Sequence, residues 1–389
     1  MIRHKLILLL ISIILPALAH GSSFIVGQNE SIQAAIDGAS AGDTILVMGG
    51  VHNESLIINK ALQLRGIRMP EIDSGEDEVA VNLSAGGVVL DGFFINCSNR
   101  TSKGEQGIRI ISNNNLIINN VVKNHGYGIA VLNSSHNILE GNTIQDSDAG
   151  IYVSGGSLNK AIGVDANNNN YGIHLQNTTD TIIEGCNASH NSYGILLDAA
   201  RNCIVADNKA FNNSKYGIQL RRADGNSLIG NSAGHNLWEG IYLEDCSNNT
   251  FAGGNISCNE MNGLSLKGGQ ENAIIGSLFV NNGYNGISLD GSLGDLIIGN
   301  AVRNNQRRGI SISRCTDCIL LYNIAENNSM TGIELNRGRA NVITGNNING
   351  NLDGISIDDA DGYTVSSNLA HYNKQIGIKL GELSNSTVI

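Results

Sequence analysis

The fold is decided by residues 191–220, NSYGILLDAARNCIVADNKAFNNSKYGIQL, which hold one complete copy of a repeat that runs through most of the chain. Each copy opens with Gly-Ile, or once Gly-Leu, and in this stretch the pair begins at Gly194 and again at Gly217. The pair occurs thirteen times from Gly107 to Gly377, at intervals of 21 to 23 residues. A fixed period of this length indicates a solenoid, in which successive copies stack on one another.

Apolar residues recur at fixed places within each copy. The third residue after the Gly is Ile, Val or Leu every time, as in Val131, Val153 and Leu175, and the residue directly after the Gly is also apolar. This alternation predicts a short strand with one buried face. Two further apolar columns follow, eleven and sixteen residues after the Gly. Each coil is therefore expected to contain three short strands.

Asparagine is the other residue with a fixed place. The chain has 54 asparagines and 48 glycines among 389 residues. Nineteen residues after the Gly, Asn occupies ten of eleven consecutive copies, from Asn169 to Asn373, and Ser147 is the exception. Asn tolerates the left-handed backbone region, and its amide can donate to one neighbour while it accepts from another. The column predicts an asparagine ladder at an internal turn.

These patterns fit one architecture. A leucine-rich repeat, a hexapeptide β-helix with a period near 18 and a calcium-binding nonapeptide roll each need motifs that are absent from the sequence. We therefore predict an all-β fold, a single-stranded right-handed parallel β-helix with three short strands per coil and about 22–23 residues per coil. Residues 31–38 carry a Ser N-cap and predict a short helix that caps the first coil. Strands at 44–48, 56–59 and 61–66 are expected to form irregular opening coils.

The two ends of the chain carry signals of their own. Residues 1–19 combine basic residues, an apolar run and Ala17-Leu18-Ala19, a pattern typical of a cleaved secretion signal. Residues 20–106 would then form the capping helix and opening coils, and residues 107–389 the regular repeats. Only twelve residues follow Gly377, so an open parallel edge is expected there, which would either bind another protein molecule or fray.

The charge and the hydropathy of the sequence exclude some classes of function. The net charge of −11 argues against a nucleic-acid partner that needs a basic surface. No later stretch approaches 18 apolar residues, so no transmembrane anchor is expected. We predict a secreted protein, either extracellular, periplasmic or on the cell surface.

The seven cysteines show no regular spacing, which is not typical of a disulfide framework. Most are expected to be small core residues. Cys315 and Cys318 form the only CxxC pair, for which packing, a local disulfide and a metal site all remain open.

The segment SIQAAIDGASAGDTILVMGGVHNESLIINKALQLRGI, followed by the GI-x-L repeats, resembles the NosD-type and pectin-lyase-like group of exported β-helix proteins. The resemblance covers residues 31–389, and this group includes carbohydrate-binding and sugar-hydrolysing proteins. It implies a role toward sugars or the cell envelope, but the fold alone specifies no activity. NosD proteins are linked to copper-site assembly for nitrous oxide reductase. Five Met and nine scattered His give that copper-linked alternative no support.

In pectin-lyase-like enzymes the cleft lies outside the strand that here carries Gly-Ile, so its outward residues are the candidate site. The charged residues four positions after the Gly alternate in sign over five coils: Asp198, Arg221, Glu244, Lys267 and Asp290. They predict either a solvated ladder of ion pairs or part of a glycan-binding strip. The predicted carbohydrate-binding residues are Tyr152, His174, Gln219, Arg221, Tyr242, Glu244 and Lys267.

An enzyme, a polysaccharide lyase or glycoside hydrolase, is the alternative. Asp198 and Glu244, or Glu244 and Asp290, would lie about 9.6 Å apart, near the separation that inverting glycosidases use. Because a general acid needs a raised pKa, the cations Arg221 and Lys267 between these carboxylates argue against the role. We therefore expect a non-catalytic protein that binds a polysaccharide or cell-envelope glycan without a cofactor. The acidic turn Asp358-Asp359-Ala360-Asp361 could bind calcium but is better explained as a surface turn.

Overall fold

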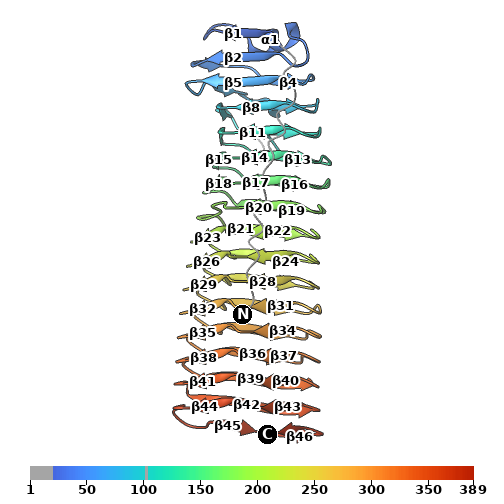
Figure 1. Cartoon of the computed structure of the whole chain (residues 1–389). Coiled ribbons are helices and arrows are strands. Elements are labelled where there is room, and N and C mark those ends of the chain that lie inside the picture. The colour runs from blue at the N-terminus through green and yellow to red at the C-terminus, as the bar shows by residue number, and fades with distance from the viewer. Residues whose placement is uncertain (1–20, 101–103) are drawn as a thin grey trace, which may run out of the picture.

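The computed structural model describes residues 21–100 and 104–389 as a column of coils stacked along one axis (Figure 1). The predicted secretion signal at 1–19 lies outside the described residues. Each strand pairs in parallel with the equivalent strand of the next coil, so that Val131 lies beside Val153, and Val153 beside Leu175. The predicted parallel β-helix with three strands per coil is confirmed.

One helix precedes the regular coils, as predicted. Helix α1 (Ile32–Gly38) begins after Ser31, whose Oγ accepts a hydrogen bond of 3.1 Å from the backbone N–H of Ala34. Ile32 and Ile36 are completely buried, so the apolar face of the helix closes the end of the core. The N-cap and the i, i+4 apolar pair explain why so short a segment is helical.

The strands form three faces. The face that carries the Gly-Ile strands is a 16-stranded sheet. It comprises β4 (Leu56–Ile58), β7 (Val79–Leu83), β10 (Gln106–Ile110), β13 (Tyr127–Leu132), β16 (Ala149–Ser154), β19 (Tyr171–Gln176), β21 (Tyr193–Asp198), β24 (Ile218–Arg221), β27 (Ile241–Glu244), β30 (Leu264–Lys267), β33 (Ile287–Asp290), β36 (Ile310–Ser313), β39 (Thr331–Arg339), β42 (Asp353–Asp361), β45 (Ile378–Leu380) and β46 (Leu383–Ser384). We call it the Gly-Ile sheet.

The second face is a 17-stranded sheet. It comprises β1 (Ser23–Val26), β2 (Thr44–Met48), β5 (Gln63–Ile67), β8 (Val89–Asp91), β11 (Leu116–Ile118), β14 (Ile138–Glu140), β17 (Lys160–Ile162), β20 (Ile182–Glu184), β22 (Ile204–Ala206), β25 (Ser227–Ile229), β28 (Thr250–Ala252), β31 (Ala273–Ile275), β34 (Leu296–Ile298), β37 (Ile319–Leu321), β40 (Val342–Thr344), β43 (Thr364–Ser366) and β47 (Thr387–Val388).

The third face has two sheets, of six and eight strands, which the isolated bridges of Asn187 connect. It comprises β3 (Val51–His52), β6 (Glu71–Asp73), β9 (Phe94–Asn96), β12 (Val121–Lys123), β15 (Thr143–Gln145), β18 (Asp165–Ala166), β23 (Lys209–Phe211), β26 (Ser232–Gly234), β29 (Asn255–Ser257), β32 (Leu278–Val280), β35 (Ala301–Arg303), β38 (Ile324–Glu326), β41 (Asn347–Asn349) and β44 (Leu369–His371).

Asparagine ladders line all three corners, whereas the sequence predicted one. In the predicted ladder, Asn213 donates to Asn236, and Asn236 donates in turn to Asn259. A second ladder lies between the Gly-Ile sheet and the second face and includes Asn226, Asn249 and Asn272. A third lies between the second and third faces and includes Asn300, Asn323 and Asn346. At each corner, buried side-chain amides thus form the hydrogen bonds that the backbone N–H and C=O groups need.

Most cysteines occupy these corners. No disulfide joins them in the described part of the chain, and all except Cys258 are buried. Cys203 and Cys318 stand in the second ladder, and each of their backbone N–H groups donates to the next Asn of that ladder. The prediction that most cysteines are small core residues is consistent with this placement.

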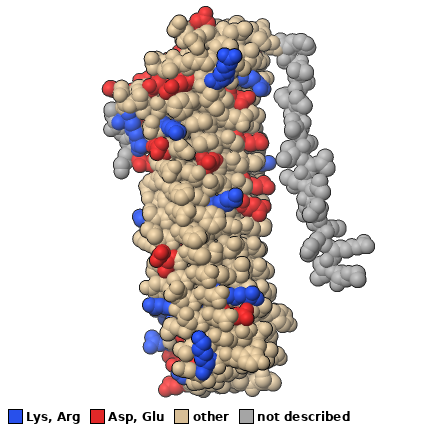
Figure 2. Space-filling view, turned by 90° about the vertical axis from the view of Figure 1, so that its left-hand side faces the viewer, with Lys and Arg blue, Asp and Glu red and all other residues tan. Residues whose placement is uncertain are grey.

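The outer surface carries few charged side chains. Figure 2 shows acidic and basic residues scattered over a largely uncharged face. In the last coil, Ile378, Leu380 and Ile389 are 40%, 41% and 88% exposed. Binding of a protein partner at this edge stays a prediction. Within the described residues, no helix is both long and apolar enough to span a membrane.

Candidate functional site

The predicted site residues stack in register on the outer side of the Gly-Ile sheet. Tyr152 lies beside His174, and Gln219 beside Tyr242. Further along each strand, Glu244 pairs in register with both Arg221 and Lys267. The sheet therefore brings these residues together, as their common spacing from the Gly implies.

The structure adds a second column of rings, from the residue directly before the Gly or, in the case of Trp238, from the second residue before it. Together the two columns form what we call the aromatic strip: Tyr127, Tyr152, Tyr171, His174, Tyr193, Tyr216, Trp238 and Tyr242. These rings cover the outward side of the sheet, which explains why Tyr242 is only 7% exposed and Gln219 only 9% exposed. The strip holds six of the ten tyrosines and the single Trp of the chain.

Most rings in the aromatic strip stack face to face along the axis. The ring centroids of Tyr171 and Tyr193 are 4.7 Å apart with an interplanar angle of 12°, and those of Tyr216 and Tyr242 are 4.7 Å apart with an angle of 15°. Stacking at these distances uses the ring faces, which leaves edges and hydroxyl groups for a ligand. Trp238 differs, because its ring lies at 77° to that of Tyr216 and is part of a side chain that is 39% exposed.

Two lysines lie against the aromatic strip. The Lys215 ammonium is 4.6 Å from the ring centroid of Tyr193 and 5.5 Å from that of Trp238, and it donates a 2.8 Å hydrogen bond to the Tyr193 hydroxyl. The Lys267 ammonium is 5.5 Å from the ring centroid of Tyr242. These cation–π contacts hold both ammonium groups beside the rings.

Asp198 is tied to two arginines. The Arg221 guanidinium donates to both carboxylate oxygens, at 3.1 and 2.6 Å, and Arg222 donates at 3.0 Å. Burial would raise the pKa of the Asp198 carboxyl, but the hydrogen bonds from Arg221 and Arg222 outweigh it and lower the pKa. Asp198 is therefore ionised near neutral pH, and a general-acid role does not suit it.

The alternating ladder of ion pairs is only partly formed. Asp290 pairs with Arg314, whose Nε donates at 2.9 Å, and not with Lys267. Among the described residues, neither Glu244 nor Lys267 has an ion pair within 4.0 Å. Because Lys267 lies against Tyr242 instead, the charges contribute to the aromatic strip more than to a continuous ladder.

Glu239 is a buried carboxyl that the sequence reasoning missed. It directly precedes Gly240 and is 7% exposed beside the rings of the strip. Its Oε1 accepts hydrogen bonds from Asn262 Nδ2 at 3.3 Å and from Ser265 Oγ at 3.4 Å. Burial raises the pKa of the Glu239 carboxyl. A buried carboxyl with a raised pKa has the electrostatic character of a proton donor, and Glu239 lies beside the rings of the strip.

A cavity of about 400 Å³ opens at the N-terminal end of the strip, between Tyr127, Tyr152, Tyr171 and His174. Burial lowers the pKa of the His174 imidazole to about 4, so this side chain is neutral at pH 7. The Tyr152 hydroxyl donates to the Gln176 side chain. The cavity thus has a polar lining, to which Asp148 contributes a carboxylate that pairs with Arg100 at 3.2 Å.

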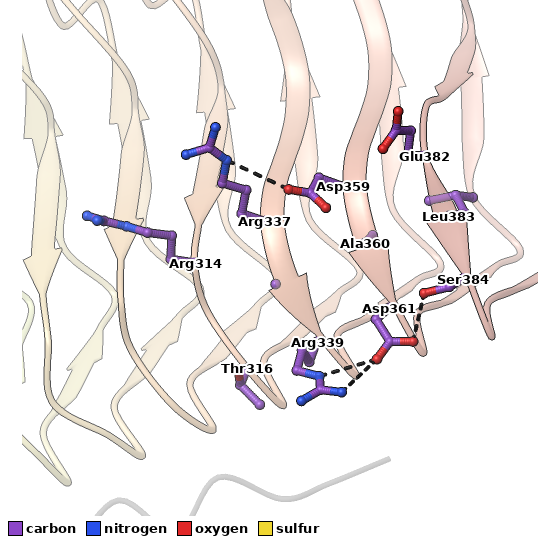
Figure 3. Close-up of a pocket in the computed structure, with 11 residues that line it drawn as sticks. Arg314, Thr316, Arg337, Arg339, Asp359, Ala360, Asp361, Glu382, Leu383 and Ser384 are labelled. Atoms are coloured by element: carbon purple, nitrogen blue, oxygen red, sulfur yellow. Dashed lines mark hydrogen bonds and ion pairs between the residues drawn. The ribbon is translucent and has the colours of Figure 1, made fainter.

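A larger hollow of about 760 Å³ lies near the C-terminal end, and Figure 3 shows the charged side chains that line it. Arg337 pairs with Asp359 at 3.7 Å, and Arg339 donates to Asp361 at 2.9 Å. Hydrogen bonds from Asn385, Arg339 and Ser384 lower the pKa of Asp361 to about 2. In the acidic turn that was considered for calcium, the carboxylates of Asp359 and Asp361 thus form ion pairs with arginines.

The missed tyrosines had a signal in the sequence. Tyr-Gly-Ile recurs four times, beginning at Tyr127, Tyr171, Tyr193 and Tyr216. The outward residues predicted from the sequence all lie after the Gly. In the structure β13, β19 and β21 already begin at Tyr127, Tyr171 and Tyr193, so the residue before the Gly belongs to the same sheet, which the repeat spacing alone does not show.

Comparison with known families and folds gives the following matches. A family model described as periplasmic copper-binding protein (NosD) matches residues 36–163 and 156–285, and a model described as right handed beta helix region matches residues 222–370. No curated protein matches the sequence.

Solved structures with a similar fold include an epimerase module and a bacteriophage tailspike protein. The A-module of mannuronan C-5 epimerase AlgE4 from Azotobacter vinelandii is 16% identical, and the match covers 92% of this chain and 94% of that chain with a TM-score of 0.52. Tailspike protein 3 of bacteriophage CBA120 is 13% identical, with 92% and 58% of the two chains covered and a TM-score of 0.55. At these identities the likeness shows the fold alone.

Proposed function

The chain belongs to the NosD family, and from this premise we propose that it is an exported, non-catalytic β-helix protein of the cell envelope that binds a polysaccharide along the aromatic strip. The observation that carries the proposal is the continuous row of eight rings on one face of the column. Two further findings support the proposal. The NosD family is described as periplasmic, and the AlgE4 A-module, which has the same fold, is named as an epimerase of the polysaccharide mannuronan.

The chemistry of the strip suits a sugar polymer. Sugars present hydroxyl groups at their rims, and the stacked tyrosines leave ring edges and phenol hydroxyls to meet them. Trp238 supplies a ring oriented across the stack, on which a sugar ring can pack. The ammonium groups of Lys215 and Lys267, together with Gln219 and Arg221, supply hydrogen-bond donors along the same line. The Glu244 carboxylate adds an acceptor.

A glycan array on the mature protein, followed by calorimetric titration of the best-binding polysaccharide, tests the proposal. Tyr242→Ala, Arg221→Ala and Trp238→Ala each remove one contact from the strip and are expected to weaken binding at least fivefold, about 1 kcal/mol. Tyr171→Phe keeps the stack but removes a hydroxyl, and we expect a smaller loss.

Tyr322→Ala is the matched control, because Tyr322 is 64% exposed on a different corner of the column. It is expected to bind like the unchanged protein. If the strip variants and Tyr322→Ala bind equally well, the aromatic strip is not the binding site. Binding to none of the array glycans would remove the proposal altogether.

A polysaccharide lyase or glycoside hydrolase is the second candidate, and Glu239 is the observation that favours it. A buried carboxyl with a raised pKa beside a polar strip could donate a proton to a leaving group. Reducing-sugar release and the ultraviolet absorbance of unsaturated sugar ends measure both reactions over a polysaccharide panel. Turnover that Glu239→Gln abolishes, while binding persists, would establish this candidate in place of the non-catalytic one.

Copper, which the family description names, does not fit the residues present. Among residues 21–100 and 104–389, no group of three or more His, Cys, Asp or Glu side chains is placed to hold a metal ion. The thiols of Cys315 and Cys318 lie outside the segments that the NosD model matches, and both are completely buried. We therefore derive no copper-dependent step for this chain.

A further inference from the structure

Two positions at the corner after each Gly-Ile strand bring their side chains into contact within one coil. They lie six and nine residues after the Gly and are three residues apart in the sequence. In the coil of Gly128, Asn137 Nδ2 donates to Ser134 Oγ at 3.2 Å. In the coil of Gly172, the Thr178 and Thr181 hydroxyls are 3.1 Å apart. The side chains of the two positions therefore meet at this corner, and in the coil of Gly172 the two atoms in contact are each one bond beyond Cβ.

Cys315 and Cys318 occupy these two positions in the coil of Gly309. The register is fixed on both sides, since Thr316 bridges to Leu293 in the preceding coil and to Arg339 in the following one. Both cysteines are 0% exposed. The Cα atoms at the ends of a four-residue turn lie within about 7 Å, the range that disulfides span. Sulfur atoms that take the places of the Thr178 and Thr181 hydroxyls, which are 3.1 Å apart, need only a small shift to bond.

We propose that Cys315 and Cys318 form a disulfide that joins the two sides of this corner. In several regular coils an amide at the second position ties the corner to the preceding coil, because Asn272 donates to Cys246 O and Asn341 donates to Cys315 O. Cys318 interrupts that ladder directly after Asp295, whose Oδ2 is buried and has no hydrogen-bond partner. The covalent bond restrains the corner at the rung where the ladder amide is missing.

The other cysteines provide an internal contrast. Cys246 occupies the first of the two positions, but Asn249 occupies the second. Cys203 occupies the second, but Ala200 occupies the first. Among the described coils, only the one that begins at Gly309 has a thiol at both positions, so the inference is specific to this pair.

The oxidant is a small-molecule disulfide such as oxidised glutathione, which is reduced to two glutathione thiols while the two cysteines form their disulfide. The Cys315 thiolate attacks the glutathione disulfide, which forms a mixed disulfide and releases one glutathione thiolate. Cys318 then loses its proton and attacks the mixed disulfide, which forms the Sγ–Sγ bond and releases the second glutathione. Since both thiols are buried in the finished fold, the exchange takes place before the corner closes.

Differential alkylation tests the proposal. The full-length chain is refolded with oxidised and reduced glutathione, unfolded in guanidinium without reductant, treated with iodoacetamide and digested with trypsin. Cleavage after Arg314 and Arg337 places both cysteines in one peptide, residues 315–337. We expect this peptide to be unlabelled and two hydrogen masses lighter than the dithiol, and to take up two labels only after reduction. The remaining five cysteines should be labelled without reduction.

Cys318→Ser should make Cys315 fully labelled, whereas Cys203→Ser should leave peptide 315–337 unlabelled. Full labelling of both thiols in the unreduced wild-type protein would overturn the proposal. So would a disulfide that joins either cysteine to another peptide. The measurement on the wild-type chain decides the question even if a variant fails to fold.

Discussion

Asn236 is a completely buried side chain that joins three coils by hydrogen bonds. Its Oδ1 accepts from the backbone N–H and the side-chain amide of Asn213, both at 2.9 Å. Its Nδ2 donates to Ala210 O at 3.1 Å and to Asn259 Oδ1 at 2.8 Å. No smaller side chain can replace these four bonds, so the ladder requires an amide at this place.

Asn236→Ala is expected to lower the stability of the surrounding coils by about 3 kcal/mol, because several buried polar groups lose their partners. Coils of a solenoid can open locally, so amide hydrogen exchange of residues 205–265 is the suitable measurement. Asn255→Ala is the control, since Asn255 is exposed in β29. Equal protection in the two variants would mean that the ladder contributes nothing to stability.

His174 makes stability depend on pH. Burial lowers the pKa of its imidazole from 6.5 to about 4 in the folded chain. Between these values the unfolded chain binds more protons, so the stabilising contribution is complete above pH 6.5 and is lost as the pH falls toward 4. The loss amounts to at most about 3 kcal/mol.

Denaturation midpoints measured from pH 8 to pH 4 should therefore fall more steeply for the wild-type protein than for His174→Gln. His235→Gln serves as the control, because His235 is exposed. His125, whose pKa burial also lowers to about 4, keeps part of the pH dependence in both variants. Identical slopes for His174→Gln and the wild-type protein would contradict the assignment.

At the scale of the element, the Gly of each repeat is required by close packing at the corner and not by its backbone angles. A Cβ on Gly217 would lie 2.6 Å from Gly240 O and 2.7 Å from Asn236 Nδ2. The ladder amide nineteen residues after this Gly thus occupies the space that a side chain would need. This contact explains why Gly and the ladder Asn recur with the same period.

Gly217→Ala is expected to destabilise the protein by about 2 kcal/mol, because neither contacting group is a flexible chain end that can move away. Gly38→Ala provides the opposite case: a Cβ on Gly38, at the end of α1, meets nothing within 4 Å. Since Ala favours the helix, that variant should be neutral or slightly more stable. Thermal unfolding of both variants measures the difference, and a neutral Gly217→Ala would exclude the packing explanation.

The elements also show how far a sequence can predict such a fold. Helix α1 was predictable because Ser31, Ile32, Ile36 and Gly38 act locally, as cap, buried pair and terminus. The ladder through Asn236 was predictable because its column is almost pure Asn. The second ladder was missed because Thr181, Cys203, Asp295 and Cys318 interrupt its column, so its members match no simple pattern.

For the candidate site, the sequence predicted the positions but not the contacts. Tyr152, His174 and Tyr242 were found because strand alternation fixes which side they face. The pairing of Asp290 with Arg314 and the approach of Lys267 to Tyr242 depend on how long side chains turn at the surface. The periodicity of the backbone does not determine the orientation of these long side chains.

For the whole molecule, stacking converts a period in the sequence into a line in space. Residues that recur every 21 to 23 positions lie along the axis of the column (Figure 1). Rings and amides at such positions therefore form rows. Such a column offers a ligand a long and nearly straight track. A polymer suits that track better than a small molecule, because each coil adds one more contact.

The length of the aromatic strip sets the size of the ligand that it can hold. Its rings come from six consecutive coils between Tyr127 and Tyr242, and strands stack about 4.8 Å apart, so the strip is about 24 Å long. An extended polysaccharide along the axis gains contacts with each added sugar until it covers the strip. Affinity should therefore rise with oligosaccharide length and then become constant.

Calorimetric titration with a size series of the best-binding glycan measures this dependence. Tyr127→Ala removes a ring at one end, so we expect long oligosaccharides to bind this variant more weakly, while the shortest ones that bind at Trp238 are unaffected. Trp238→Ala should instead weaken binding at every length. If a single sugar binds as tightly as a long chain, the ligand does not lie along the strip, and a local pocket such as the cavity at His174 becomes the binding site.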